Sequence, residues 1–504
     1  MRRMSNFVLD SLATSSSSSS RLGRWTVSSS GGETPLSVPT PAFLVHTLGG
    51  SVPHLTADVL LQHVFPEQRP PLLVSIDNCA TFVDSVAQFG SGIAKFAGLP
   101  QFPVFLSPHN PGKKVLPSGY NIGESVALWG RRGKTALTVA EHQRIVAAFK
   151  PQFFQTLSDY DISSTSGLKR MKKSTTRTLE FLDKTTSGSS NGADLFATVE
   201  LGWFKVDGEE ANKTVKAMLT NKLDAIKGFI ISGQGLTCAE VYLSGSSGRM
   251  IPEGVTLSLS PNKTEGQKKG PMNNKKRTQM DTEKKSSLNS TPVEDKADED
   301  DKSTDSTKTS DLDYAAISEV VALLPAHLPR YVPGPLSPYE ILELVLLGVD
   351  LFDSSWVTAS ADLGHVLVLD ELTKYFPDGH EVKINNESLP GGKNGDEGTN
   401  SSNETGCTIS IKDKKYFSDF TPLSSSCSCY TCRKHTKSYL NHLYATEELL
   451  GPVLVMIHNL TSFNTMMATI RHVVKKDAGV SSQTESSTSS QESLDRLKQC
   501  LKPC

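Results

Sequence analysis

Short apolar segments that alternate with amphipathic ones limit the fold of this chain more than any other feature. The short segments carry few polar residues, whereas a strand exposed on one side alternates polar and apolar residues. Helical patterns at residues 139–149, 174–182 and 337–347 lie between several of them. The short segments are residues 71–76, 104–106, 195–201, 228–231, 349–352 and 366–369. This alternation predicts an α/β protein with a parallel sheet that is buried on both faces.

The best-marked helix covers residues 337–347. Ser337 can cap this helix, Pro338 suits its first position, and Glu340 completes a capping box. Gly348 ends the helix, and an apolar strand follows directly. Repeats of this unit in 504 residues predict either a (β/α)8 barrel or a doubly wound sheet. The chain has no G-x-G-x-x-G after an early strand and no Walker A motif, which argues against a nucleotide-binding sheet.

Several stretches hold too few apolar residues to join a folded core. We expect disorder at about 258–310 and 385–405, and in a tail at 476–504, because such segments bury too little apolar surface to offset their ordering entropy. Residues 1–33 are a polar N-terminal segment that is compatible with a β-hairpin. The remaining residues, 34–475, are expected to form the barrel domain.

Charge and hydropathy exclude several classes of protein. The 52 basic and 54 acidic side chains give a net charge of -2, which excludes a wholly basic nucleic-acid coat but not a local basic face. No run of about 18 apolar residues is present, so we expect no transmembrane segment. The N-terminus has no continuous apolar region and does not resemble a secretory signal. We therefore expect a cytoplasmic protein.

Three of the eight cysteines, Cys427, Cys429 and Cys432, lie close together on one predicted loop. Zinc binds four soft or borderline ligands in a tetrahedron, and three sulfurs on one loop can supply three of them. The histidines downstream are His435, His442, His458 and His472. His458 lies beside the apolar stripe of a separate helix that begins near Gly451, and a helix hairpin can bring it back over the loop. We therefore predict one structural Zn²⁺ held by the three cysteines and His458; the alternative is three ordinary cysteines and a core histidine.

The Cys-x-Cys-x2-Cys loop, followed by His458 in an Ile-His-Asn-Leu context, resembles the zinc site of the tRNA-guanine (queuine) transglycosylase family. The segment Gly348–Asp353, which reads GVDLFD, is similar to a barrel strand of that family. Other similar segments are residues 40–43, 92–100, 169–183, 329–334 and 439–451. The resemblance spans about 34–475 and implies a (β/α)8 TIM-type barrel with a zinc-binding insertion, about 408–475, near the C-terminus.

The sequence departs from the family where catalytic members carry their acid/base and base-reading motifs. The family's Asp-Ser-Gly-Gly-Phe-Gln motif falls on PVFLSPHNP, so Ser107 or Pro108 stands in place of the acid/base Asp. The Val-Gln-Gly-Gly segment falls on Val199–Gly202, with the bulky Leu201 where a purine edge needs room. The family's Gly-Gly-Leu-x-Val-Gly-Glu loop is reduced to Lys227–Gly233. No carboxylate remains in the first stretch to move a proton.

The family's nucleophilic Asp falls on Asp353, at the predicted carboxyl end of a barrel strand. Barrel enzymes place their chemistry there, and a carboxylate in that position can form a glycosyl–enzyme intermediate. The family's following Pro-Thr-Arg run reads SSWVTAS here, so Thr358 matches and Ala359 replaces the Arg. The resemblance therefore implies that Asp353 is vestigial and that the chain has no catalytic residue.

This pattern resembles the catalytically reduced, accessory members of the family. It implies that this chain forms a heterodimer with a catalytic subunit. That subunit exchanges guanine for queuine at the wobble position of tRNAs with GUN anticodons. The resemblance further implies that this chain helps to dock tRNA and that it does not bind DNA. One alternative is an active transglycosylase that uses Asp353, with Asp159 as the second carboxylate. Another is a zinc-containing scaffold without an RNA role. Candidates for contact with tRNA phosphates are Lys169, Arg170, Lys172, Lys173, Arg177, Arg433, Lys434 and Lys437.

Overall fold

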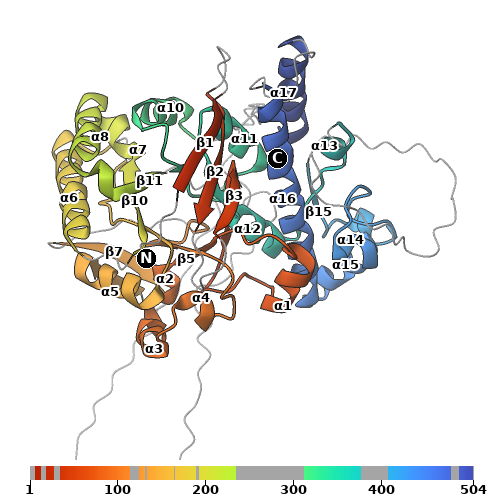
Figure 1. Ribbon diagram of the computed structural model, residues 1–504. Coiled ribbons are helices and arrows are strands. Elements are labelled where there is room, and N and C mark those ends of the chain that lie inside the picture. The colour runs from red at the N-terminus through yellow and green to blue at the C-terminus, as the bar shows by residue number, and fades with distance from the viewer. Residues whose placement is uncertain are drawn as a thin grey trace, which may run out of the picture. The chain divides into compact units, whose positions relative to one another are not determined.

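Eight short parallel strands close into a barrel in the computed structural model of the chain (Figure 1). Strands that are neighbours in the barrel follow one another in the sequence, and β13 pairs with β4 to complete the circle. Every residue of β4, β5 and β6 is buried, as expected for a sheet covered on both faces. The (β/α)8 prediction is confirmed. The strands are β4 (Ala42–His46), β5 (Leu72–Ser75), β6 (Val104–Ser107), β9 (Phe153–Gln155), β10 (Asp194–Glu200), β11 (Ile226–Ser232), β12 (Arg330–Tyr331) and β13 (Leu351–Asp353).

Helices follow the strands and cover the outside of the barrel (Figure 1). The capping box at the start of α11 is formed: the Ser337 hydroxyl oxygen accepts from Glu340 N–H at 3.3 Å, and the Glu340 carboxylate accepts from Ser337 N–H at 2.8 Å. These helices are α1 (Ala57–Val59), α2 (Ile76–Cys79), α3 (Val83–Phe89), α4 (Ile93–Phe96), α5 (Val139–Phe149), α6 (Leu168–Ser187), α7 (Leu201–Val206), α8 (Gly208–Lys222), α10 (Tyr314–Leu323), α11 (Pro338–Leu346) and α12 (Ser355–Leu363).

The structure describes most of the chain. The predicted disordered inserts at about 258–310 and 385–405 lie outside the described residues. The described residues are 6–12, 19–27, 35–113, 124–130, 133–163, 165–188, 192–233, 312–375, 407–477 and 487–502.

A three-stranded antiparallel sheet of β1 (Asn6–Leu12), β2 (Arg21–Val27) and β3 (Leu36–Thr40) closes the amino end of the barrel. Trp25 of β2 is 1% exposed, and its ring lies 4.1 Å from that of Phe153 and 6.0 Å from that of Phe196. These rings join the side chains of the barrel interior in one apolar cluster. The barrel is therefore a filled core and not an open channel.

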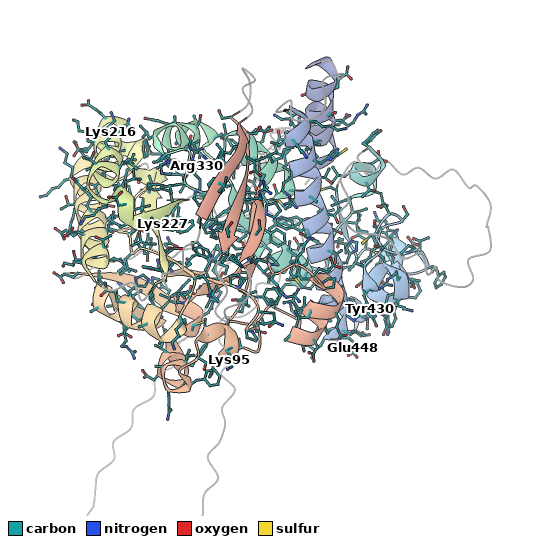
Figure 2. All side chains as sticks on the ribbon, in the orientation of Figure 1. Lys95, Lys216, Lys227, Arg330, Tyr430 and Glu448 are labelled. Atoms are coloured by element: carbon teal, nitrogen blue, oxygen red, sulfur yellow. The ribbon has the colours of Figure 1, made fainter. Side chains whose placement is uncertain are left out.

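A buried ion pair fastens this sheet to the barrel. The Arg21 guanidinium donates to both carboxylate oxygens of Asp350, directly before β13, and to Ala326 O and Leu328 O at 2.7 Å each. The Asp350 carboxylate also accepts from Arg330 N–H at 2.8 Å. The Arg330 side chain lies at the same end and donates to Gly348 O at 3.0 Å (Figure 2). Arg21 and Asp350 are 1% and 0% exposed, so their charges depend on each other for compensation.

The C-terminal part packs on one side of the barrel. The long helix α16 (Leu450–Asp477) contacts α12 on the barrel side (Figure 1). A small subdomain lies on its other side: β14 (His365–Leu367), β15 (Thr408–Ser410), α13 (Asp370–Tyr375), α14 (Tyr430–Lys434) and α15 (Lys437–Ala445). One window of α16 is apolar enough to cross a membrane, with a mean hydropathy of 1.2, but 72% of it is buried inside the molecule. That burial is typical of a core helix.

Two sequence predictions are wrong in this part of the chain. The apolar run at 366–369 is not a barrel strand: β14 pairs antiparallel with β15 in a separate two-stranded sheet. The tail predicted as disordered from residue 476 contains α17 (Ser487–Leu501). Leu494, Leu497 and Leu501 repeat at helical spacing and are buried, and α17 contacts α16, α11 and α13. The polar composition of the tail concealed this narrow apolar stripe.

We predict that Arg21→Met lowers the free energy of unfolding by about 3–5 kcal/mol, because it leaves the Asp350 carboxylate buried without its counter-charge. Arg24→Met is the matched control, because Arg24 pairs with Asp10 at 3.1 Å on the same sheet but is 62% exposed. The control should lose no more than about 1 kcal/mol. Chemical denaturation measures both variants, and equal losses would show that the buried pair does not fasten the sheet.

Candidate functional site

Four possible metal ligands converge between α14 and α16. The ligand atoms of Cys427, Cys429, Cys432 and His458 all lie within 4.8 Å of one another. His458 Nδ1 is 3.2 Å from Cys432 Sγ and 3.6 Å from Cys429 Sγ. Ligands held tetrahedrally at about 2.0–2.3 Å from one ion stand roughly 3.3–3.8 Å apart. The four residues could therefore hold one metal ion between them.

Local structure explains why these atoms meet. Cys429 is the N-cap of α14, and its sulfur accepts from Cys432 N–H at 3.4 Å, which brings two of the three sulfurs together. The Thr431 hydroxyl donates to Leu454 O at 2.7 Å and fixes α14 against α16. His458 lies one turn further along α16, facing the loop. Of the other histidines, His435 and His442 lie outside the cluster, and His435 stacks on Tyr439 instead.

The far side of the His458 ring is held by the subdomain. His458 Nε2 lies 2.9 Å from Leu367 O of β14, so Nε2–H donates there and leaves Nδ1 directed at the sulfurs. The neighbouring Asn459 accepts from Leu367 N–H at 2.9 Å and donates to His365 O at 2.8 Å. β14 thereby orients the histidine, and the ligand set also links β14 to α16.

The pKa values in the cluster move in opposite directions: contacts with Cys427 and Cys429 raise the pKa of Cys432 above its usual range. Hydrogen bonds from the thiols of Cys429 and Cys432 hold the pKa of Cys427 well below its usual range. Burial lowers the pKa of His458, but the charge of Cys427 beside it outweighs this effect and raises the pKa well above its usual range. A metal ion bound here would displace the protons that remain on the ligands and would satisfy all four ligand atoms at once.

Asp353, at the family's nucleophile position, lies at the carboxyl end of β13 and is 0% exposed. One carboxylate oxygen accepts from Tyr331 O–H and from Gly334 N–H, each at 2.9 Å. The other accepts from Ser355 N–H at 2.9 Å. Burial raises the pKa of Asp353, and these hydrogen bonds partly offset the rise. Both oxygens are committed to the protein itself.

The segment after β6 lies over this position. His46 Nε2 is 2.8 Å from Asn110 Oδ1, and His46 Nδ1 is 3.0 Å from Thr358 Oγ1. Asn110 Oδ1 also accepts from Gly112 N–H at 2.9 Å. A Cβ placed on Gly112 would stand only 3.2 Å from Ser355 Cβ. The Gly112 backbone therefore packs directly against Ser355, which is one of the hydrogen-bond donors to Asp353. Burial lowers the pKa of His46, which favours its neutral form.

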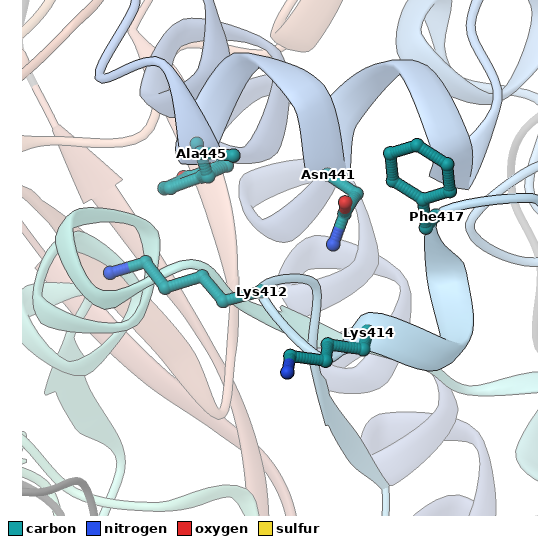
Figure 3. A pocket seen from close by; sticks show the side chains of 6 residues that line it. Lys412, Lys414, Phe417, Asn441 and Ala445 are labelled. Carbon is teal, nitrogen blue, oxygen red and sulfur yellow. The ribbon is translucent and has the colours of Figure 1, made fainter.

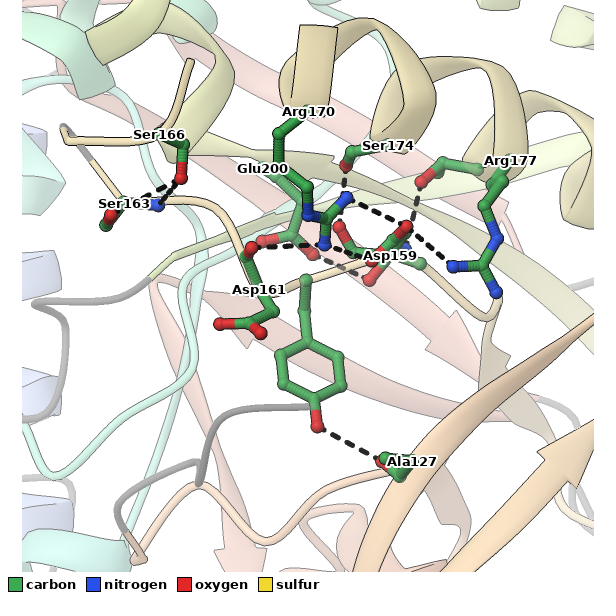
Figure 4. A network of polar contacts seen from close by, with 12 residues as sticks. Ala127, Asp159, Asp161, Ser163, Ser166, Arg170, Ser174, Arg177 and Glu200 are labelled. Carbon is green, nitrogen blue, oxygen red and sulfur yellow. Dashed lines mark hydrogen bonds and ion pairs between the residues drawn. The ribbon is translucent and has the colours of Figure 1, made fainter. Parts of the chain in front are cut away.

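The proposed second carboxylate, Asp159, is held by two arginines (Figure 4). Arg170 donates to both its oxygens at 2.7 and 3.0 Å, and Arg177 donates to one of them at 2.8 Å. The Ser174 hydroxyl donates to Asp159 O at 2.6 Å. Asp159 is 0% exposed, and these contacts stabilise the start of α6.

The other residues that the resemblance aligned with catalytic motifs also point into the protein. Ser107, where the acid/base Asp is expected, donates to Gln155 Oε1 at 2.8 Å. Glu200 accepts from the Ser158 hydroxyl at 2.6 Å, and Leu201 after it is buried. The reduced loop Lys227–Gly233 forms most of β11 and does not project from the barrel.

The predicted phosphate contacts divide into two groups. Arg177 is buried against Asp159, so that prediction is wrong, and Arg170 is paired with the same carboxylate. Lys437 pairs with Asp419 at 3.3 Å, and Arg433 is half-buried. The candidates that remain exposed are Lys169, Lys172, Lys173 and Lys434.

The sequence analysis did not identify Tyr331 and His46. Tyr331 donates a hydrogen bond to Asp353, and His46 contacts Asn110 in the segment after β6. Each lies at the carboxyl end of its strand, Tyr331 on β12 beside β13 and His46 on β4 on the other side of it. Because the carboxyl ends of parallel strands meet at one edge, this position was the signal that could have found them.

We predict that Cys429→Ser removes the bound metal ion and destabilises the subdomain, because three ligands bind far more weakly than four. Elemental analysis should find about one ion per wild-type chain and little in the variant. Cys500→Ser is the control, since Cys500 is a free cysteine outside the cluster. Folded wild-type protein without metal would contradict the site.

We predict that Glu200→Gln stabilises the protein at pH 8. Burial raises the pKa of Glu200 from 4.5 to about 7. Between these values the folded state binds the proton and the unfolded state does not, so stability falls as pH rises through this window. The loss amounts to at most about 3 kcal/mol, and the variant should escape it. Unfolding curves at pH 5 and pH 8 test this; a variant as pH-dependent as the wild type would count against the assignment.

Comparison with known proteins agrees with these features. The family model described as queuine tRNA-ribosyltransferase matches residues 16–243 and 305–490. A Xenopus tropicalis protein is 29% identical over 86% of this chain and 89% of its own length. A Drosophila erecta protein is 29% identical over 94% of this chain and 90% of its own length. A Caenorhabditis briggsae protein is 28% identical over 91% of this chain and 97% of its own length. Each is named queuine tRNA-ribosyltransferase accessory subunit 2.

The family match covers most of the 504 residues, including all eight barrel strands and the four clustered ligands. The chain therefore belongs to the queuine tRNA-ribosyltransferase family.

Proposed function

We propose that this chain is a non-catalytic accessory subunit of a queuine tRNA-ribosyltransferase complex. Its catalytic partner would exchange guanine for queuine at the wobble position of tRNAs with GUN anticodons. The relatives' names contain the words accessory subunit, which implies a partner that performs the reaction. The observation that carries the proposal is the burial of Asp353 with both of its oxygens accepting internal hydrogen bonds.

The rival, an active transglycosylase, needs a free nucleophile and a second proton carrier. Asp353 would first have to give up Tyr331, Gly334 and Ser355 as donors, which leaves buried polar groups unpaired at about 1–3 kcal/mol each. Asp159 would have to leave two guanidinium groups. These costs favour the accessory role.

Zinc is the metal that the four ligands suit best. Three thiolates and one imidazole form a closed tetrahedral set, which is typical of structural zinc and leaves no position for a substrate. The ion would hold α14, α16 and β14 together. It would thereby shape the exposed surface of the subdomain and take no part in the reaction.

That surface is the proposed contact with the catalytic subunit. Phe417, Phe420 and Leu449 are 73%, 75% and 85% exposed. The Ser438 hydroxyl donates to Phe417 O at 2.6 Å, so the loop that carries two of these side chains is held against α15. Rigid, exposed apolar side chains in one small subdomain are typical of a protein interface.

Docking of tRNA is proposed for the carboxyl face of the barrel. Lys169, Lys172 and Lys173 are exposed near the start of α6, which follows β9 and therefore begins on that face. Ammonium groups there can neutralise phosphates. The second rival, a scaffold without an RNA role, predicts no tRNA binding by the assembled complex. The cytoplasmic location is likewise a proposal, drawn from the sequence alone.

We predict that guanine exchange into tRNA needs both subunits. The assay compares this chain alone, a catalytic subunit of the family alone, and the two mixed; only the mixture should show full exchange. Asp353→Asn in the mixture should keep the rate, although it should lower the unfolding temperature because it disturbs three hydrogen bonds. Exchange by this chain alone, abolished by Asp353→Asn, would establish the rival.

We predict that Phe420→Ser combined with Leu449→Ser weakens binding to the catalytic subunit about tenfold or more, through loss of apolar burial. Because both side chains are exposed, the unfolding temperature should hardly change. Phe89→Ser, on α3 and 46% exposed, is the matched control. Equal affinity of the test variant and the control in a titration would place the interface elsewhere.

A further inference from the structure

A cavity of about 600 Å³ opens on the surface of the metal-bearing subdomain (Figure 3). Asn441 and Ala445 of α15 form one side, and Lys412 and Lys414 lie across from them on the segment after β15. Its lining residues are Lys412, Lys414, Phe417, Asn441, Tyr444 and Ala445. No part of the barrel's carboxyl face lines it.

The cavity walls are fixed by hydrogen bonds. The Tyr444 hydroxyl donates to Ala361 O of α12 at 2.6 Å, which holds the ring by its far end. The Asn441 side-chain amide donates to Ile411 O at 2.8 Å and to Asp413 O at 3.1 Å. These bonds fix the backbone on both sides of Lys412. The cavity is therefore preformed, and an occupant would not have to order it.

The rim of the cavity is cationic. Lys412 Nζ lies 5.5 Å from the centre of the Tyr444 ring, and among the described residues neither Lys412 nor Lys414 forms an ion pair. Lys415 differs, because its ammonium lies 3.9 Å from Asp413 and over the Tyr416 ring. Two available ammonium groups, one of them over an aromatic ring, suit an anionic group attached to an apolar body.

The surroundings favour a protein over RNA as the source of that group. Exposed Phe420, Leu449 and Leu450 lie in the same subdomain. Glu447 and Glu448, exposed just after α15, would repel a phosphate backbone but can accompany a protein surface. We propose that the cavity receives an Asp or Glu with an adjacent apolar side chain from the catalytic subunit, the carboxylate pairing with Lys412 and Lys414. This inference rests on the proposed function.

The test is the affinity of the full chain for the catalytic subunit, measured by titration at two salt concentrations. Lys412→Glu with Lys414→Glu should weaken binding about tenfold or more, because like charges then meet. Ala445→Trp, which fills the cavity without changing charge, should also weaken it. Lys415→Glu is the matched control and should bind like the wild type. Lys412→Gln with Lys414→Gln should bind with a weaker dependence on salt.

Other outcomes separate this inference from the proposed function. Wild-type affinity in both Lys412/Lys414 double variants and in Ala445→Trp would overturn the inference and leave the accessory role intact. Unchanged subunit binding with weaker tRNA binding by the complex would assign the cavity to RNA and also overturn it. A wild-type chain that does not bind the catalytic subunit would overturn both.

Discussion

A buried carboxylate must find hydrogen-bond donors, and in this barrel the donors come from the protein itself. Asp353 ends β13 at the face where barrel enzymes bind their substrates, yet Tyr331, Gly334 and Ser355 already use its oxygens. The segment through Asn110 then closes over it. Where an active barrel enzyme presents a nucleophile, this chain holds a buried carboxylate within its own hydrogen bonds. The proposed division of labour between two subunits depends on this arrangement.

The second constraint is the ligand cluster on α16. One face of this helix packs on α12 of the barrel, and the other holds His458, whose ring is oriented by Leu367 O of β14. A metal ion bound in this cluster would fix a subdomain too small to have a core of its own. The loop that carries the exposed Phe417 and Phe420 lies on that subdomain, and so does the cavity lined by Lys412 and Lys414. Metal binding would thus be linked to the surface that we assign to the partner.

The sequence was sufficient wherever a feature depends on local chemistry. The capping box at Ser337 and Glu340 follows from spacing along one helix. The choice of His458 over His435 needed one further step, a helix hairpin that returns a separate helix to the cysteine loop. Features that depend on distant contacts were missed. Arg177 forms an ion pair with Asp159, and strand β14 pairs with β15 outside the barrel. Neither pairing can be predicted from the sequence pattern alone. The helix α17 was missed because three leucines in a polar tail are buried only by packing on distant elements, α16, α11 and α13.

The most direct test of the central claim is to ask which subunit becomes covalently attached to tRNA. A transglycosylase nucleophile forms a glycosyl–enzyme bond, which can be captured by denaturing the assembled complex during turnover and separating its chains. If Asp353 is sequestered as described, labelled tRNA will remain attached to the catalytic subunit alone. Labelled tRNA on this chain, lost on Asp353→Asn, would contradict the account.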